Sequence, residues 1–154
     1  MEPPKQVKAE TSADYLEVLT KAVFESGMSW KVIEAKWPGF QEAFRGFDPE
    51  RVVGFSPDEI DALTSDTRIV RNRRKIESTI HNAATMLELE REFGSVRAYL
   101  QSKPDFWDLV KDIRKRFKHV GDFGAYYFLY VVGEPVPAND EFRAKLLEGA
   151  TKKG

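Results

Sequence analysis

Seven consecutive residues near the start of the chain combine an acid, an apolar tip and an indole. Glu25 supplies a carboxyl group that can exchange a proton or balance a cation, and Trp30 supplies a flat ring on which another ring can stack. Gly27 lets the chain turn sharply, so we expect Met28 to protrude and Trp30 to turn inward. Taken alone, this stretch favours ordinary core packing of the tryptophan over a ligand platform.

A second stretch, Phe117–Ala125, has the composition of a phosphate-binding turn. Gly121 lies in an expected tight turn ahead of a helix, and free backbone N–H groups at a helix start can hold a phosphate oxygen. The turn looks like a helix-hairpin-helix DNA grip, with basic side chains beside it. The residues expected to contact DNA there are the backbone of Val120, Gly121 and Gly124 and the side chain of Lys118.

The net charge of −1 gives no global signal for nucleic acid, but positive charge gathers in two segments. One of them, residues 68–75, contains Arg71 and Arg73, and the other, residues 111–118, leads into the turn at Gly121. A single basic segment is best read as a solvated helix face. Two of them, one beside a glycine turn, favour a phosphate track of the kind that proteins use to bind double-stranded DNA.

A third candidate lies near the C-terminus. The helix expected over 126–132 is apolar or aromatic on every face, so other helices should enclose it. Pro135 and Pro137 stop it and place Asn139 and Asp140 on a loop at its end. The alternative role for Asp140 is a cap for a last helix over 141–147.

Composition narrows the class of protein. At 154 residues the chain fits one domain, and the absence of cysteine excludes disulfides and thiolate metal sites. With two histidines, a histidine-rich metal site is not expected, and neither is a cofactor. No apolar run approaches the ~20 residues of a membrane span, and the N-terminus lacks a signal-peptide core. We therefore expect a soluble, cytoplasmic monomer.

Hydrophobic spacing predicts an all-α fold, because no segment shows sustained strand alternation. Residues 1–12 read as a flexible lead-in, and 13–154 as a single helical domain. Ser12 or Asp14 can cap the first helix, and Pro38-Gly39 should break or bend the second. A long helix is expected from Arg71 to Phe93, ended by Gly94.

The ordered series of these segments is similar to the 3-methyladenine DNA glycosylase I family of the helix-hairpin-helix glycosylases. The pattern comprises 24–30, 40–49 (FQEAFRGFDP), 69–76 (IVRNRRKI), Asn82-Ala83 and 117–140. The resemblance implies a base-excision enzyme that flips a methylated adenine from the duplex and cuts its N-glycosidic bond. Such a base is cationic and already a good leaving group, so recognition matters more than acid catalysis.

The resemblance also implies roles for individual residues. Trp30 matches the stacking tryptophan, Met28 matches the residue that fills the gap in the duplex, and Glu25 falls at a polar pocket position. Asp140, or Asn139 by spacing, occupies the place of the catalytic aspartate of the wider superfamily. Glu25 and Asp140 are thus the predicted catalytic residues, and Trp30 the predicted base-binding residue.

The chain departs from the family pattern at several points. Ala22 stands where the family has its recognition glutamate, and residues 1–14 lack the family's N-terminal pocket segment. The zinc ligands are absent, and Phe123 replaces the lysine that lyases use in the hairpin. We therefore expect a zinc-free, monofunctional hydrolase. The alternatives are a non-catalytic helix-hairpin-helix DNA-binding protein and a glycosylase for another lesion.

Overall fold

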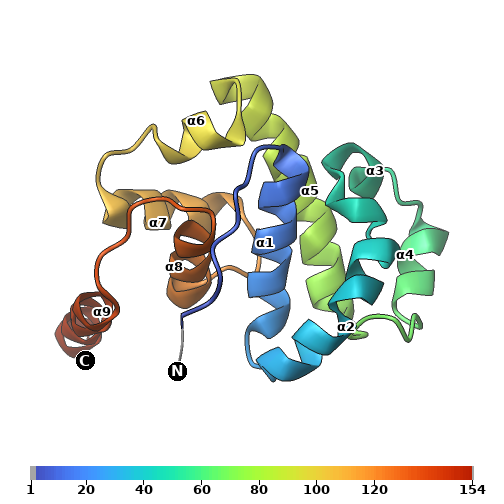
Figure 1. Ribbon diagram of the computed structural model, residues 1–154, viewed down its shortest axis with the longest axis horizontal. Coiled ribbons are helices and arrows are strands. Elements are labelled where there is room, and N and C mark those ends of the chain that lie inside the picture. Colours follow the sequence, from blue (N-terminus) through green and yellow to red (C-terminus); the bar gives the residue numbers. More distant parts are fainter. Residues whose placement is uncertain (1–2, 154) are drawn as a thin grey trace.

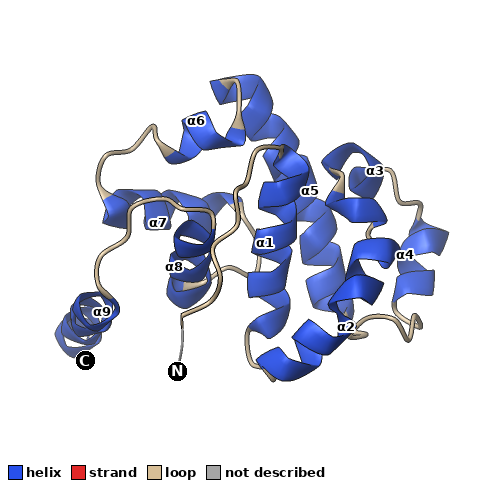
Figure 2. Cartoon of the chain, in the orientation of Figure 1, coloured by secondary structure: helices blue, strands red, loops and turns tan. Residues whose placement is uncertain are grey.

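The chain folds into helices joined by turns, as the sequence predicts. The computed structural model describes residues 3–153, and in that range every regular element is a helix (Figure 2). The all-α fold class is confirmed. The elements are α1 (Ser12–Glu25), α2 (Trp30–Ala43), the short 3-10 helix η1 (Arg45–Phe47), α3 (Pro49–Val53), α4 (Pro57–Leu63), α5 (Arg73–Phe93), α6 (Val96–Leu100), α7 (Phe106–Arg116), α8 (Asp122–Val131) and α9 (Asn139–Lys153).

Helices α1 and α5 lie at the centre of the molecule, with α2, α3 and α4 on one side and α7 and α8 on the other (Figure 1). The long helix begins at Arg73, two residues later than expected, because Asn72 takes the cap position and its side chain accepts a hydrogen bond from the Lys75 N–H. Gly94 ends it as predicted, at a φ of 91° that favours glycine. Within the described residues, no helix is both long and apolar enough to cross a membrane.

Helix α1 starts at a capping box and ends at the turn that carries the first candidate residues. Thr11 is the cap, and Asp14 is its partner: each side chain accepts a hydrogen bond from the other's backbone N–H. The sequence predicted the cap at Ser12 or Asp14, but the cap is Thr11, one residue before Ser12. The helix ends at Glu25, and Gly27, at a φ of 73°, turns the chain so that Trp30 begins α2.

Helix α2 continues through Pro38 and Gly39, where the sequence predicts a break or bend. Its buried face explains the difference, because stacked aromatic rings on both sides of the proline keep the helical spacing. Gly39 is required for packing, since a Cβ atom there would lie 2.4 Å from the carbonyl oxygen of Arg68. The rings that stack are Trp37, Phe40, Phe44 and Phe47.

Helix α8 is not enclosed on every face. Ala125, Phe128 and Leu129 are buried, whereas Tyr126 and Tyr127 are half-buried. The expectation of a helix enclosed on every face is wrong, because tyrosine hydroxyl groups stay near water or polar partners. The partly open side of α8 helps to form the site described below.

Residues 3–10, which we call the N-terminal strap, contain no helix and run between α1 and α8 (Figure 1). The Val7 N–H donates to the carbonyl oxygen of Val131 over 2.8 Å, and the Gln6 side chain donates to that of Tyr130 over 2.9 Å. Ala9 is buried. The strap is thus attached to the C-terminal end of α8.

Candidate active site

A cavity of about 910 Å³ lies between α1, α2, α8 and the N-terminal strap. Glu25 at the end of α1 and Trp30 at the start of α2 both line it, and Tyr127 lines it from α8. Its volume lies within the roughly 300–1,000 Å³ that is typical of small-molecule sites. Two of the residues nominated by the sequence therefore share one cavity, which we call the base cavity.

The Glu25 carboxyl group is half-buried and makes no hydrogen bond or ion pair within the described part of the chain. Burial raises its pKa from 4.5 to about 6; the charge of Lys21 opposes this rise and that of Glu34 adds to it. Lys21 forms an ion pair with Glu34 instead. At neutral pH, Glu25 is therefore a largely ionised acceptor that has no protein partner.

Trp30 and Met28 are both at the surface, with exposed fractions of 51% and 40%. Met28 protrudes, as expected. The core-packing interpretation of Trp30 is wrong, and so is the expectation that it turns inward, because Ile33, Trp37 and Phe40 fill the buried face of α2. The indole is instead part of the wall of the base cavity.

The end of α1 is held by Lys75, a residue that the sequence placed in a basic segment. Its side chain is only 5% exposed, and Nζ donates to the carbonyl oxygens of Phe24, over 3.2 Å, and Ser26, over 2.5 Å. Burial lowers the pKa of Lys75. Because these two carbonyls flank Glu25, the buried lysine fixes the backbone that carries the acid.

The strap supplies the remaining wall of the base cavity. Its lining residues are Pro3, Pro4, Lys5, Val7 and Lys8. Sequence reasoning did not find this role, because the segment has little apolar periodicity and its backbone partners lie more than 120 residues away. Part of the segment predicted to be a flexible lead-in, residues 1–12, therefore walls the cavity.

The hairpin between α7 and α8 spans residues 117–121 and is built differently from the expectation. Its left-handed residue is His119, at a φ of 63°, while Gly121 is extended and a Cβ atom there would meet nothing within 4 Å. Histidine tolerates this conformation better than most residues. No side chain caps α8, so its first backbone N–H groups remain available to an anion.

Helix α5 holds the hairpin through the side chain of Asn82, which is 1% exposed. Its amide donates to the carbonyl oxygen of Lys118 over 3.1 Å and accepts from the Lys118 N–H over 2.8 Å. His81 and Thr85 hydrogen-bond the carbonyl oxygen of Arg116. Sequence reasoning included Asn82 in the family pattern but did not find this function.

The predicted DNA-binding side chains differ in how free they are. Lys118 and Arg71 are exposed and form no ion pair with another described residue. Arg73 pairs with Asp61 and Glu77. Val120 is buried beneath the turn, and the backbone at Gly124 approaches its side chain.

Comparison with known proteins identifies the family. A model described as methyladenine glycosylase matches residues 6–125. The chain belongs to the methyladenine glycosylase family. DNA-3-methyladenine glycosylase 1 of Escherichia coli strain K12 is 26% identical over an alignment of 130 residues, and the match covers 71% of this chain and 70% of that protein.

Solved structures agree with the family match. The 3-methyladenine DNA glycosylase I of Staphylococcus aureus superimposes with a TM-score of 0.75 at 27% identity, covering 84% of this chain and 80% of that one. A variant of a 3-methyladenine DNA glycosylase I in complex with 3-methyladenine gives a TM-score of 0.73 at 27% identity, covering 84% and 81%. The predicted resemblance is confirmed.

Asp140 lies beyond the residues that match the methyladenine glycosylase model. It is in the first turn of α9, exposed, and accepts a hydrogen bond from the Glu141 N–H over 3.0 Å. Asn139 accepts one from Arg143 over 2.8 Å. The last helix begins at Asn139 rather than at 141, and neither residue lines the base cavity.

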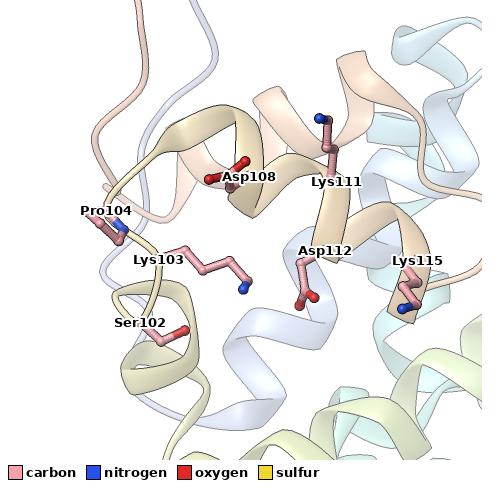
Figure 3. Close-up of a pocket in the computed structure, with 7 residues that line it drawn as sticks. All are labelled: Ser102, Lys103, Pro104, Asp108, Lys111, Asp112 and Lys115. Carbon is pink, nitrogen blue, oxygen red and sulfur yellow. The ribbon is translucent and has the colours of Figure 1, made fainter.

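A second hollow, of about 490 Å³, lies beside α7 (Figure 3). Lysines and acids surround it, and Asp112 is occupied by hydrogen bonds from the Tyr99 hydroxyl and from Arg116. It offers no aromatic wall for a base. Among the described residues, no three His, Asp or Glu side chains lie close enough together to bind a metal ion.

Proposed function

We propose that this protein is a monofunctional DNA glycosylase that hydrolyses the N-glycosidic bond of an alkylated purine such as 3-methyladenine in duplex DNA. One observation carries the proposal: a chain of the methyladenine glycosylase family places an unpaired carboxylate, Glu25, and an exposed indole, Trp30, in one cavity. A glycosylase must take its base out of the helix and hold it in a pocket of this kind.

The base cavity suits a cationic base. Trp30 stacks on the flipped ring, and its electron-rich face attracts positive charge by about 0.5–2 kcal/mol. Glu25 accepts a hydrogen bond from the base and balances its charge, in a partly desolvated position where that attraction is stronger than in water. Both interactions favour a methylated, positively charged purine over a normal one.

The hairpin and the turn at Gly27 hold the DNA. Backbone N–H groups at Gly121 and beyond bind a phosphate, and Lys118 and Arg71 add positive charge along the strand. Met28, at the tip of the α1–α2 turn, fills the space left by the flipped nucleotide. These contacts are supported by exposure and by unpaired donors.

Bond cleavage then needs only modest help from the protein, because a cationic base leaves readily. Water is the proposed nucleophile, since the hairpin position that lyases fill with lysine is Phe123 here. Asp140 is a candidate for stabilising the positive charge on the sugar, or for orienting that water, once DNA is bound. Its place outside the base cavity makes it secondary to Glu25 in this proposal.

Base release provides the test. Duplexes carrying 3-methyladenine, 7-methylguanine or hypoxanthine are incubated with the wild type, with Trp30→Ala and with Val32→Ala, which removes another exposed apolar side chain from the same turn of α2. We expect release of at least one alkylated base by the wild type and Val32→Ala, and a loss of at least ~10-fold in Trp30→Ala.

The same assay separates the alternatives. Tight binding to abasic duplex without release of any base by any protein would support a non-catalytic DNA-binding protein. Release of hypoxanthine alone would point to another lesion. We also propose that the protein is monomeric and cytoplasmic. Size-exclusion chromatography with light scattering tests the first: we expect a single peak at the mass of one chain without DNA, and at the mass of one chain plus one duplex when duplex is added.

A further inference from the structure

The base cavity contains a second polar group without a protein partner, the hydroxyl of Tyr127. No described residue makes a hydrogen bond to it. The neighbouring Tyr126 hydroxyl, by contrast, donates to the carbonyl oxygen of Pro137 over 2.6 Å, and the Tyr99 hydroxyl donates to Asp112 over 2.5 Å. A half-buried tyrosine usually satisfies its hydroxyl, so one left free in a cavity is available to a ligand.

Tyr127 and Glu25 are placed as a pair on different helices. Tyr127 is on α8 and Glu25 at the end of α1, and both line the cavity. Burial, followed by the charges of Glu25 and Glu34, raises the pKa of Tyr127, so the hydroxyl keeps its proton. The cavity therefore presents a hydroxyl that can donate and a carboxylate that only accepts.

A donor beside an acceptor-only group is complementary to the edge of adenine that carries N6 and N7. Adenine carries a donor, the exocyclic N6 amino group, directly beside an acceptor, N7, whereas guanine presents the acceptors O6 and N7 at the same positions. Hypoxanthine shares the 6-oxo group of guanine. Through this N7-containing edge, a 6-oxo purine would place an acceptor against the Glu25 carboxylate, while a 6-amino purine would satisfy both protein groups.

We propose that Tyr127 is a specificity-determining residue that reads the flipped base together with Glu25. Its hydroxyl donates to a ring nitrogen while the carboxylate accepts from the adjacent amino group, which selects 6-amino over 6-oxo purines. This inference rests on the proposed glycosylase function. It also assigns the reading of the base to two residues other than Ala22, which is buried on α1 near Gly124 of α8.

The test compares Tyr127→Phe with Tyr126→Phe, which removes a hydroxyl from the same helix but not from the cavity. Single-turnover release of 3-methyladenine is measured for both and for the wild type, together with binding of free 3-methyladenine and free hypoxanthine by tryptophan fluorescence. We expect Tyr127→Phe to lose about 10-fold in release and in 3-methyladenine affinity, as for one hydrogen bond, with no loss for hypoxanthine.

Each outcome has a distinct meaning. If the wild type releases no alkylated base, the proposed function fails and this inference with it. If the wild type releases base and Tyr127→Phe matches it within about twofold, the role of Tyr127 alone is overturned. An equal loss in Tyr126→Phe, or an equal loss of hypoxanthine affinity in Tyr127→Phe, would show a general effect on α8 and would also overturn it. Thermal melting of all three proteins checks that the ring substitutions leave the fold intact.

Discussion

The base cavity and the hairpin use their polar groups in opposite ways. In the cavity, Glu25 and Tyr127 have no partner within the described chain. At the hairpin, Asn82 uses both its donor and its acceptor on the backbone of Lys118. In the cavity, polar side-chain groups are left without hydrogen-bond partners, whereas at the hairpin a side chain uses its hydrogen bonds to hold the backbone.

The difference follows from what each region is proposed to bind. A flipped base is recognised through its edge and its charge, which require side-chain groups that are free and partly desolvated. A phosphate is bound by backbone N–H groups, which require only that the turn be rigid. The polar groups of the cavity should therefore favour activity at a cost in protein stability, whereas those of the hairpin should add stability and hold the turn in place. Mutations can separate these two effects.

The largest effect is expected from Glu25→Gln. Base release should fall by at least ~100-fold, because a preorganised charge is lost, while the free energy of unfolding at pH 7.5 should rise by up to about 2 kcal/mol, because the glutamine carries no buried charge. Excision kinetics and urea unfolding measure the two. Glu88→Gln, on an exposed position of α5, is the matched control. A destabilised, fully active Glu25→Gln protein would contradict the assignment.

In the wild-type enzyme, titration of Glu25 should make both stability and activity depend on pH. Glu25 has a pKa of about 6 in the folded protein against an ordinary 4.5, so its contribution to stability is present below pH 4.5 and is lost as the pH rises through 6. Activity should change in the opposite direction, falling about 10-fold per pH unit below 6 as the carboxylate is protonated. The charges of Lys21 and Glu34 act on its pKa, and the other titratable groups that line the cavity are Tyr127, Lys5, Lys8, Asp14 and Glu17.

A profile of single-turnover rates from pH 4.5 to 8 measures that dependence. The limb near pH 6 should disappear in Glu25→Gln, because the glutamine side chain has no proton to lose. Its persistence in the variant would assign the limb to another group. Because the substrate base keeps its positive charge over this range, the profile reports on the protein.

Asn82→Ala tests the hairpin in the same terms. It leaves the N–H and carbonyl groups of Lys118 without partners, which should lower the free energy of unfolding by about 2–3 kcal/mol. Duplex affinity should fall about 10-fold, while binding of free 3-methyladenine in the cavity should be unchanged. Fluorescence anisotropy and tryptophan quenching measure the two. Asn82→Asp, which still accepts from the Lys118 N–H, should be intermediate.

The sequence predicted well what depends on neighbouring residues. Glu25 and Trp30 are five positions apart around one turn, so their meeting follows from Gly27 and helix spacing. The end of α5 at Gly94 follows from the conformation that glycine favours. In these cases, local backbone preference and the structure point to the same answer.

What the sequence could not show depends on contacts between distant segments. In the sequence, Lys75 looks like a surface charge, but in the structure it hydrogen-bonds the end of α1. The strap looks like a loose terminus, but its backbone hydrogen-bonds Val131. The proline in α2 suggested a break, but aromatic packing kept the helix intact. The base cavity needs three helices and the strap at once, so no single motif could define it.

Smaller effects are expected from the exposed basic residues. Lys118→Ala should weaken duplex binding a few-fold for any sequence and lower the salt dependence, the slope of log K against log salt, by about 1, since one phosphate contact is lost. Arg73→Ala should change less, because its guanidinium is already paired with Asp61 and Glu77. Titrations at several salt concentrations compare them. A larger salt effect for Arg73 would place the phosphate track along α5 instead.

The smallest effect is expected from Asp140→Asn. Its carboxylate is exposed in the first turn of α9 and outside the base cavity, and the leaving base already carries positive charge, so release of 3-methyladenine should fall by less than about 5-fold. An asparagine keeps the hydrogen bond to the Glu141 N–H, so stability should change little. Single-turnover release at saturating enzyme measures this. A loss as large as that of Glu25→Gln would mean that α9 moves toward the cavity when DNA binds, and that the loop carrying Asp140 completes the active site only in the complex.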